Sequence, residues 1–99
     1  MIKTITAEKL QEKLKKETLQ LLDVRERGEY AMGHVPGAVN LPLSEFVSRY
    51  QTLDKATTYY VICQSGSRSE QAVLFLDSQG YQAINVIGGT SSWTGVLEY

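Results

Sequence analysis

Cysteine is almost absent from this chain, because Cys63 is the only one among its 99 residues. A single cysteine cannot form a disulfide within the chain, so the stability of the fold does not depend on oxidation. Long hydrophobic runs are also absent: no stretch approaches the length that spans a membrane, and residues 1–5 do not form the apolar core of a signal peptide. We therefore expect a protein of the reducing cytoplasm, either complete or one module of a longer protein.

An excess of either charge is missing as well, since Lys and Arg number 10, Asp and Glu number 11, and the net charge is −1. This balance argues against binding to nucleic acids or to anionic membranes. Histidine occurs once, as His34, with no second type of metal ligand at suitable spacing around it, so we predict no metal and expect a structural histidine bonded to backbone. Gly88-Gly89 lacks the third glycine and the long helix of a dinucleotide site, so no cofactor is predicted.

Linkers, internal repeats and low-complexity segments are absent, which predicts one domain over residues 1–99. Apolar runs and helical periodicity alternate along the chain, which predicts an α/β domain with a mainly parallel sheet. Thr6 and Ser44 are suited to cap helices, and Gly80 is suited to end one. The predicted strands are 19–24, 38–41, 59–62 and 83–87, and the predicted helices are 7–16, 26–32, one around 43–50, 68–79 and a short one near Trp93.

Cys63 stands where a strand is expected to give way to a helix. An apolar run ends at Ile62, and the helical pattern begins at Arg68 and ends before Gly80. Backbone N–H groups at the start of a helix have no partner within the helix, so they can converge on an anion held there. A thiol in this place has a lowered pKa and acts as a nucleophile. The alternative is a buried structural cysteine, and the loop that follows makes us favour the reactive thiol.

The loop after Cys63 contains the residue types that a bound anion requires. Gly66 lets the backbone turn sharply, so that successive N–H groups face the sulfur. Arg68 adds a permanent charge and a planar set of donors. The serines can donate through their hydroxyl groups, and one of them can also cap the helix. We predict a catalytic pair, Cys63 and Arg68, within an anion-binding loop that also contains Gln64, Ser65, Gly66, Ser67 and Ser69.

Asp23 and Arg25 follow another buried strand, and Asp23 falls at its carboxyl end, where ligands bind in parallel sheets. Asp23 either orients donors of the loop or forms an ion pair with Arg25 or Arg27, and we favour the ion pair. Arg25 is either a cation that faces the substrate or a surface charge, and the sequence leaves both interpretations open. We include both residues as possible supports of the site.

Taken together, these segments resemble the rhodanese-like domain family across nearly the whole chain. The order and spacing of the segments carry the resemblance, since each of them alone is unspecific. The matching segments are Leu21 to Arg25, Glu29-Tyr30, Gly33 to Ala38, Asn40 to Leu43, Cys63 to Ser69, Gly80-Tyr81, Val86 to Gly89, and Trp93.

The resemblance implies a three-layer α/β/α fold with a five-stranded, mainly parallel sheet. It also implies a sulfurtransferase, in which Cys63 takes the outer sulfur of thiosulfate or of another persulfide and carries it as a persulfide. An acceptor then removes this sulfur: cyanide in vitro, or a thiol or protein cysteine in cells. The implied partners are therefore a small sulfur donor and a thiol acceptor, without a metal or organic cofactor.

Two other functions stay open. Phosphatases and arsenate reductases related to this fold use Cys-x5-Arg, which makes room for a tetrahedral oxyanion, whereas Cys63 and Arg68 form Cys-x4-Arg, a smaller loop that favours a single sulfur atom. Rhodanese-like modules that only bind other proteins commonly lack the loop cysteine, which this chain has. Arg68 is the only charge of the loop, unlike the strongly cationic loops of thiosulfate-type enzymes, which argues against thiosulfate as the physiological donor.

Overall fold

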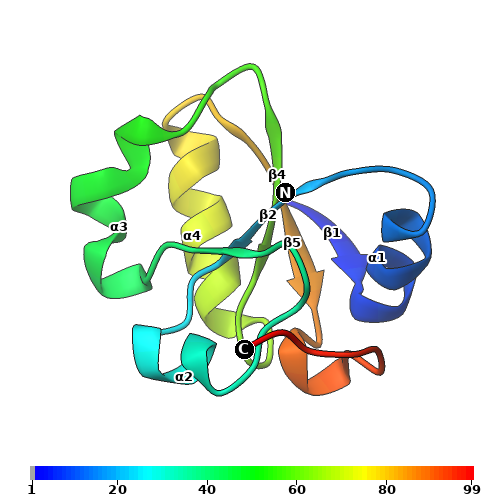
Figure 1. The fold of residues 1–99 in the computed structure, drawn as a ribbon. Coiled ribbons are helices and arrows are strands. Elements are labelled where there is room, and N and C mark those ends of the chain that lie inside the picture. The colour runs from blue at the N-terminus through cyan, green and yellow to red at the C-terminus, as the bar shows by residue number, and fades with distance from the viewer. Residues whose placement is uncertain (1) are drawn as a thin grey trace.

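Five parallel strands form the centre of the computed structural model, which describes residues 2–99 (Figure 1). The strands are β1 (Lys3–Thr6), β2 (Gln20–Asp23), β3 (Val39–Asn40), β4 (Thr58–Ile62) and β5 (Gln82–Ile87). Their order across the sheet is β1-β5-β4-β2-β3, and each of these neighbouring pairs is parallel. The expected five-stranded, mainly parallel sheet is thereby confirmed.

Helices cover both faces of this sheet. They are α1 (Ala7–Leu14), α2 (Arg27–Ala31), α3 (Leu43–Arg49) and α4 (Ser67–Ser78), with 3-10 turns η1 (Tyr50–Thr52) and η2 (Thr90–Ser92). Figure 1 shows α1 on one face of the sheet and α3 with α4 on the other, which gives the three-layer arrangement. Within residues 2–99, no helix has the length and apolar character needed to cross a membrane.

The two faces of the central strand β4 belong to two different hydrophobic clusters. Tyr59, Val61 and Cys63 pack into the cluster that α3 and α4 complete, whereas Tyr60 and Ile62 pack into the cluster that includes α1. Successive side chains of a strand point to opposite faces, so this alternation is the expected one for a strand buried on both sides. The alternation directs Cys63 toward the face that α4 covers.

Local signals fixed several element ends as the sequence predicted. Thr6 caps α1, because its hydroxyl oxygen accepts from the N–H of Lys9 at 3.1 Å. The helix before Gly80 ends in a Schellman arrangement, in which Gly80 donates to Asp77 O and Tyr81 donates to Leu76 O. These two boundaries are confirmed.

Other boundary predictions were wrong. Ser44 does not cap α3; Pro42 holds that position, and the Ser44 hydroxyl donates to Glu26 Oε1 at 2.6 Å. None of the loop serines caps α4, because the capping position is taken by Gly66. The helix predicted over 7–16 ends at Leu14. Strand β1 was not predicted from the apolar pattern, because this edge strand is mostly exposed.

We predict that Leu76→Ala lowers the free energy of unfolding by about 2–5 kcal/mol, because Leu76 is fully buried on α4 and its loss leaves a cavity. Leu74→Ala on the same helix is the matched control, since Leu74 is 52% exposed and its truncation should change stability by less than about 0.5 kcal/mol. Urea denaturation measures both. Equal losses in the two variants would contradict the assignment of the buried face of α4.

Candidate active site

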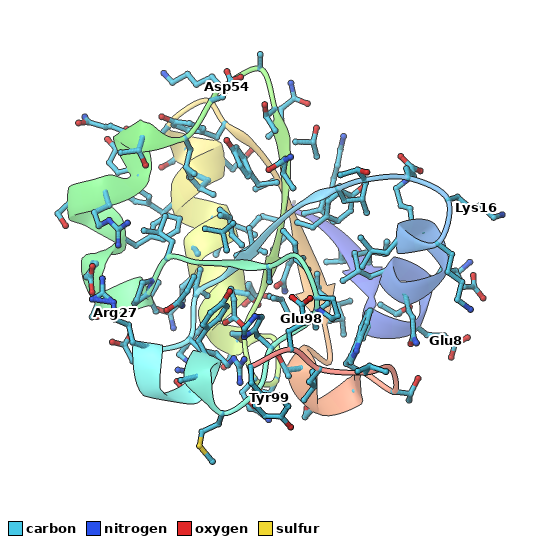
Figure 2. All side chains as sticks on the ribbon, in the orientation of Figure 1. Glu8, Lys16, Arg27, Asp54, Glu98 and Tyr99 are labelled. Atoms are coloured by element: carbon cyan, nitrogen blue, oxygen red, sulfur yellow. The ribbon has the colours of Figure 1, made fainter. Side chains whose placement is uncertain are left out.

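Two neighbouring strands end beside each other at the edge where the sequence predicts a site. Asp23 is the last residue of β2, and its Cα is paired with that of Ile62, the last residue of β4. Cys63 follows Ile62, and the three residues 64–66 separate it from Ser67, where α4 begins. Figure 2, in the orientation of Figure 1, shows Tyr99 of the C-terminal segment at this same end of the molecule. The parallel topology therefore brings Asp23 and Cys63 to one edge, as predicted.

The sulfur of Cys63 accepts hydrogen bonds from the first turn of α4 and the loop before it. The backbone N–H of Gly66 donates to Sγ at 3.0 Å, and the hydroxyl of Ser69 donates to it at 3.3 Å. Both Cys63 and Ser69 are fully buried. The sulfur thus lies at a helix start, where donors and the helix dipole favour a negative charge.

The thiol is tuned toward its anionic form. Burial by itself raises the pKa of the Cys63 thiol, but hydrogen bonds from the Ser69 hydroxyl and from the backbone N–H groups of Ser69, Gly66 and Ser65 outweigh this effect. The pKa of Cys63 is therefore lowered from its ordinary value. A thiolate is the nucleophilic form of cysteine, so this environment suits a reactive sulfur.

Gly66 is the residue that turns the loop. Its φ is +114°, a conformation that residues with a Cβ rarely adopt, and this turn points its N–H at the sulfur. The space around it is not the constraint, since an added Cβ would meet Gly88 N at 3.5 Å, an ordinary contact. Glycine is needed here for the backbone conformation.

The segment after β5 holds the other side of the loop. The N–H groups of Thr90 and Ser91 donate to the carbonyl oxygens of Cys63 and Gln64, at 2.9 and 3.0 Å. Gly89 makes this close approach feasible: its φ is +57°, and an added Cβ would lie 2.3 Å from Cys63 O. The N–H groups of η2 thus satisfy both carbonyl groups. Gly89, which the sequence analysis considered as part of a weak cofactor motif and of the family resemblance, thus allows η2 to pack against the loop.

Arg68 faces a carboxylate of α2. Its Nη1 and Nη2 donate to Oε1 and Oε2 of Glu29, at 2.6 and 2.9 Å, and the hydrogen bond from Arg68 lowers the pKa of Glu29 to about 2. Glu29 Oε1 also accepts from the N–H of Glu26, which starts α2. The pair therefore connects the loop to α2. Among the described residues, the hydrogen bonds to Sγ come from backbone N–H groups and from the hydroxyl of Ser69. The role of Arg68 in binding an anion at the loop therefore stays a prediction.

Asp23 and Arg25 form the buried ion pair that we favoured from the sequence. Arg25 Nε and Nη2 bind the Asp23 carboxylate at 2.9–3.1 Å, and Nη2 also donates to Gly33 O at 2.8 Å. Arg25 is 4% exposed, so it is not a surface charge. Its Nη1 reaches Gln64 Oε1 at 3.3 Å. The pair thus supports the residue that directly follows Cys63.

His34 is structural, as expected. Its Nδ1 lies 3.0 Å from Tyr30 O, its ring stacks on the Tyr30 ring, and its backbone pairs with Glu98. Within residues 2–99, no group of three or more His, Cys, Asp or Glu side chains is arranged to hold a metal ion.

Two cavities of the molecule lie away from the sulfur. A cavity of about 610 Å³ lies at the opposite edge of the sheet, where the strands begin with Lys3, Gln20, Thr58 and Gln82. A second, of about 340 Å³, lies beside Trp93, and Cys63 lines neither. Since Cys63 has no exposed surface, a reaction at Sγ requires a small displacement of the exposed loop residues around it, which are Gln64, Ser65 and Ser67.

Comparison with known proteins agrees with this architecture. The model of the rhodanese-like domain family matches residues 6–95, and the chain belongs to this family. It is 42% identical over 95 residues to the protein named "Putative sulfurtransferase YtwF" of Bacillus subtilis, covering 95% of this chain and 92% of that protein. It is 45% identical over 83 residues to "Putative sulfur carrier protein YrkF" of the same organism, covering 83% of this chain but only 45% of that protein.

A solved structure shows the same fold. The crystal structure of SSP1007 from Staphylococcus saprophyticus is 36% identical to this chain, with a TM-score of 0.93, over 99% of this chain and 100% of that one. The likeness therefore extends over the whole length of both chains.

We predict that Gly89→Ala destabilises the protein by at least about 1–3 kcal/mol, because the new Cβ would overlap with the backbone of the loop and φ would be strained. It should also change the rate of alkylation of Cys63, since the loop that covers Sγ and supplies its donors must shift. Gly28→Ala is the matched control: an added Cβ at Gly28 meets nothing within 4 Å, so its stability and thiol reactivity should be unchanged or slightly improved. A Gly89→Ala protein with normal stability and reactivity would contradict the close-contact role.

We predict that Glu29→Gln removes a pH-dependent contribution to stability. A carboxyl group whose pKa is lowered from 4.5 to about 2 stabilises the fold above about pH 4.5, and this contribution is lost as the pH falls toward about 2. Because the two side chains are 33% and 38% exposed, the difference between wild type and variant at neutral pH should be about 1 kcal/mol or less. Urea denaturation at a series of pH values should show this difference shrinking below about pH 4.5. A difference that stays constant with pH would contradict the pairing.

Proposed function

We propose that the protein is a sulfurtransferase that carries sulfane sulfur as a persulfide on Cys63. The observation that carries the proposal is the placement of Sγ at the start of α4, between the N–H of Gly66 and the hydroxyl of Ser69. This environment stabilises the thiolate that both halves of the reaction require. Relatives named for sulfur transfer and for sulfur carriage support the same interpretation.

In the first half-reaction, the Cys63 thiolate attacks the outer sulfur of the donor. A bond forms between Sγ and that sulfur, while the bond between the sulfur and the rest of the donor breaks. The donor leaves with the electron pair, as sulfite from thiosulfate or as a thiolate from a persulfide. The outer sulfur now carries the negative charge, and the N–H groups of residues 64–69 are the donors that stabilise it.

In the second half-reaction, an acceptor attacks the outer sulfur. A deprotonated thiol or cyanide forms a bond to it, the S–S bond to Cys63 breaks, and Sγ leaves as the thiolate. A lowered thiol pKa makes Cys63 a better leaving group in this step. Because Cys63 is the only cysteine among the 99 residues, the acceptor thiol lies outside them. A reducing cytoplasm suits this role, since it keeps Cys63 from forming mixed disulfides.

The ion pairs of the site favour sulfur transfer over hydrolysis of phosphate esters. A phosphatase uses its loop arginine to hold the oxygens of the phosphoryl group, whereas Arg68 donates through both Nη atoms to Glu29. The Cys-x4-Arg spacing argues in the same direction. Asp23 and Arg25 support the loop through Gln64. Cys63 lines neither of the two cavities described above. This position suits a donor or acceptor that presents a single sulfur atom at the surface.

We expect the reduced protein to gain one sulfur atom when it is incubated with a donor, and to lose it when treated with dithiothreitol. Intact mass spectrometry measures the gain, with thiosulfate and an organic persulfide as parallel donors. Release of thiocyanate on addition of cyanide measures turnover. Cys63→Ser should abolish both signals, because serine forms no persulfide.

Wild-type protein that has been alkylated with iodoacetamide, and shown by circular dichroism to be folded, is the matched control, since only Sγ is blocked. Absence of the sulfur gain with both donors, in protein shown to be folded by circular dichroism, would overturn the proposal in favour of a module that only binds proteins. Hydrolysis of p-nitrophenyl phosphate without a sulfur gain would indicate the phosphatase instead. Gain from the persulfide but not from thiosulfate would agree with a loop that has a single charge.

A further inference from the structure

Asn85 is a buried polar residue behind the loop that the mechanism has not used. It lies on β5 and is 4% exposed, and its side chain contacts both Ser69 and the carbonyl of Gly66. Polar groups inside a domain are normally retained only where hydrogen bonds compensate their burial. The contacts of Asn85 with Ser69 and Gly66 therefore indicate its role.

The hydroxyl group of Ser69 has more acceptors than it can serve. It lies 3.3 Å from Cys63 Sγ and 3.1 Å from Gly66 O, and it makes a short contact with Asn85 Oδ1. A serine hydroxyl has one proton, so it makes one strong donated bond at a time. Gly66 O already accepts from the N–H of Glu70, which leaves Sγ and Oδ1 as the principal competitors.

The orientation of the Asn85 amide follows from its other contact. Nδ2 donates to Gly66 O at 3.2 Å, which turns Oδ1 toward Ser69. The reversed amide would place Oδ1 against Gly66 O, two acceptors without a proton between them. Asn85 therefore presents an acceptor, and not a donor, to the Ser69 hydroxyl.

The charge on Sγ determines whether the Ser69 hydroxyl donates to Sγ or to Asn85 Oδ1. A neutral thiol sulfur is a weak acceptor, so with Cys63 in this form the Ser69 hydroxyl donates to Asn85 Oδ1, its shorter contact. When Cys63 is a thiolate, the hydroxyl turns to Sγ in a charge-assisted bond, and Oδ1 loses its donor. In a persulfide the charge lies on the outer sulfur, so the hydroxyl returns to Asn85.

We propose that Asn85 is a positioning residue whose Oδ1 accepts the hydrogen bond of the Ser69 hydroxyl whenever Sγ is uncharged and loses that bond when the thiolate forms. Asn85 thus stabilises the neutral and persulfide states of Cys63 against the thiolate. It limits how far the loop stabilises the thiolate, which keeps the sulfur basic enough to attack a donor, because nucleophilicity falls as thiol pKa falls. This inference rests on Cys63 being the nucleophile proposed above, but the test below reads the thiol directly.

Charged groups also act on Cys63, as the Coulombic interaction between Arg68 and Cys63 shows, but the variants tested below do not alter them. Arg68 of α4 is paired with Glu29 of α2, and Arg25, which follows β2, is paired with Asp23 of that strand. Substitutions at Asn85 and Ser69 leave all four side chains in place. A change in the titration of Cys63 in these variants therefore reports on the hydroxyl and its acceptors.

The experiment is a double-mutant cycle with Asn85→Ala, Ser69→Ala and the combined variant. The pKa of Cys63, the only thiol, is read from the pH dependence of the rate of alkylation by iodoacetamide. Asn85→Ala should lower this pKa, with an increase in the acid constant of about threefold to tenfold, because a competing acceptor worth one hydrogen bond is lost. Ser69→Ala should raise the pKa. In the Ser69→Ala background, removal of Asn85 should have no further effect, since the hydroxyl through which it acts is absent.

Two control variants remove similar groups from the same elements. Ser78→Ala takes from the far end of α4 a hydroxyl that donates to Phe75 O, and Gln82→Ala takes a side-chain amide from the start of β5. Neither should move the pKa of Cys63. If Asn85→Ala does not fold, Asn85→Leu tests the same loss with a side chain of similar volume.

An unchanged or raised pKa in folded Asn85→Ala or Asn85→Leu would overturn the inference, as would a shift of equal size in the Ser69→Ala background. A purely structural role for Asn85 predicts lower stability together with one of these results. The titration does not depend on sulfur transfer, so a protein that shows the expected cycle but forms no persulfide would contradict the proposed function and not this inference.

Discussion

The loop around Cys63 is organised by one constraint, which is that a buried sulfur atom must be able to carry a negative charge. Sγ has no exposed surface, so water does not solvate it, and donors of the protein do so instead. The left-handed Gly66 supplies one donor and the first turn of α4 supplies another. The carbonyl groups of Cys63 and Gln64 accept from the N–H groups of η2, and that contact in turn requires the absence of a side chain at Gly89. A change in any of these parts alters the energy of the thiolate.

Much of the fold could be predicted because its signals are local. The run 59–62 is apolar throughout, since both faces of β4 are covered, and α4 combines an apolar face with Gly80 after its end. The errors occurred where local signals were weak or where distant groups competed. Strand β1 is an exposed edge and has almost no apolar pattern. Ser44 has the right chemistry for a cap, but its hydroxyl is bound by Glu26, which lies far away in the sequence.

The same distinction applies to the site. Cys63 and the donors that follow it lie within one strand–turn–helix segment, so the sequence indicated them directly. The partner of Arg68 lies outside this segment. Glu29 belongs to a different element, and only the three-dimensional structure brings the two residues together. Asn85 gave no signal of its own, because a polar residue in an apolar strand pattern does not reveal what it contacts. The resemblance to the family identified the kind of site, whereas the contacts that tune it had to be read from the structure.

The arginines of this site have a consequence for how partners approach. Arg25 and Arg68 are each bound by a carboxylate, so each pair has no net charge. From beyond the loop such a pair acts as a dipole, and its field decays faster with distance than that of a single charge. The site therefore has little long-range attraction for an anion in solution. If the protein transfers sulfur as proposed, its partners are selected at contact with the loop, and their encounter depends on diffusion and docking more than on electrostatic steering.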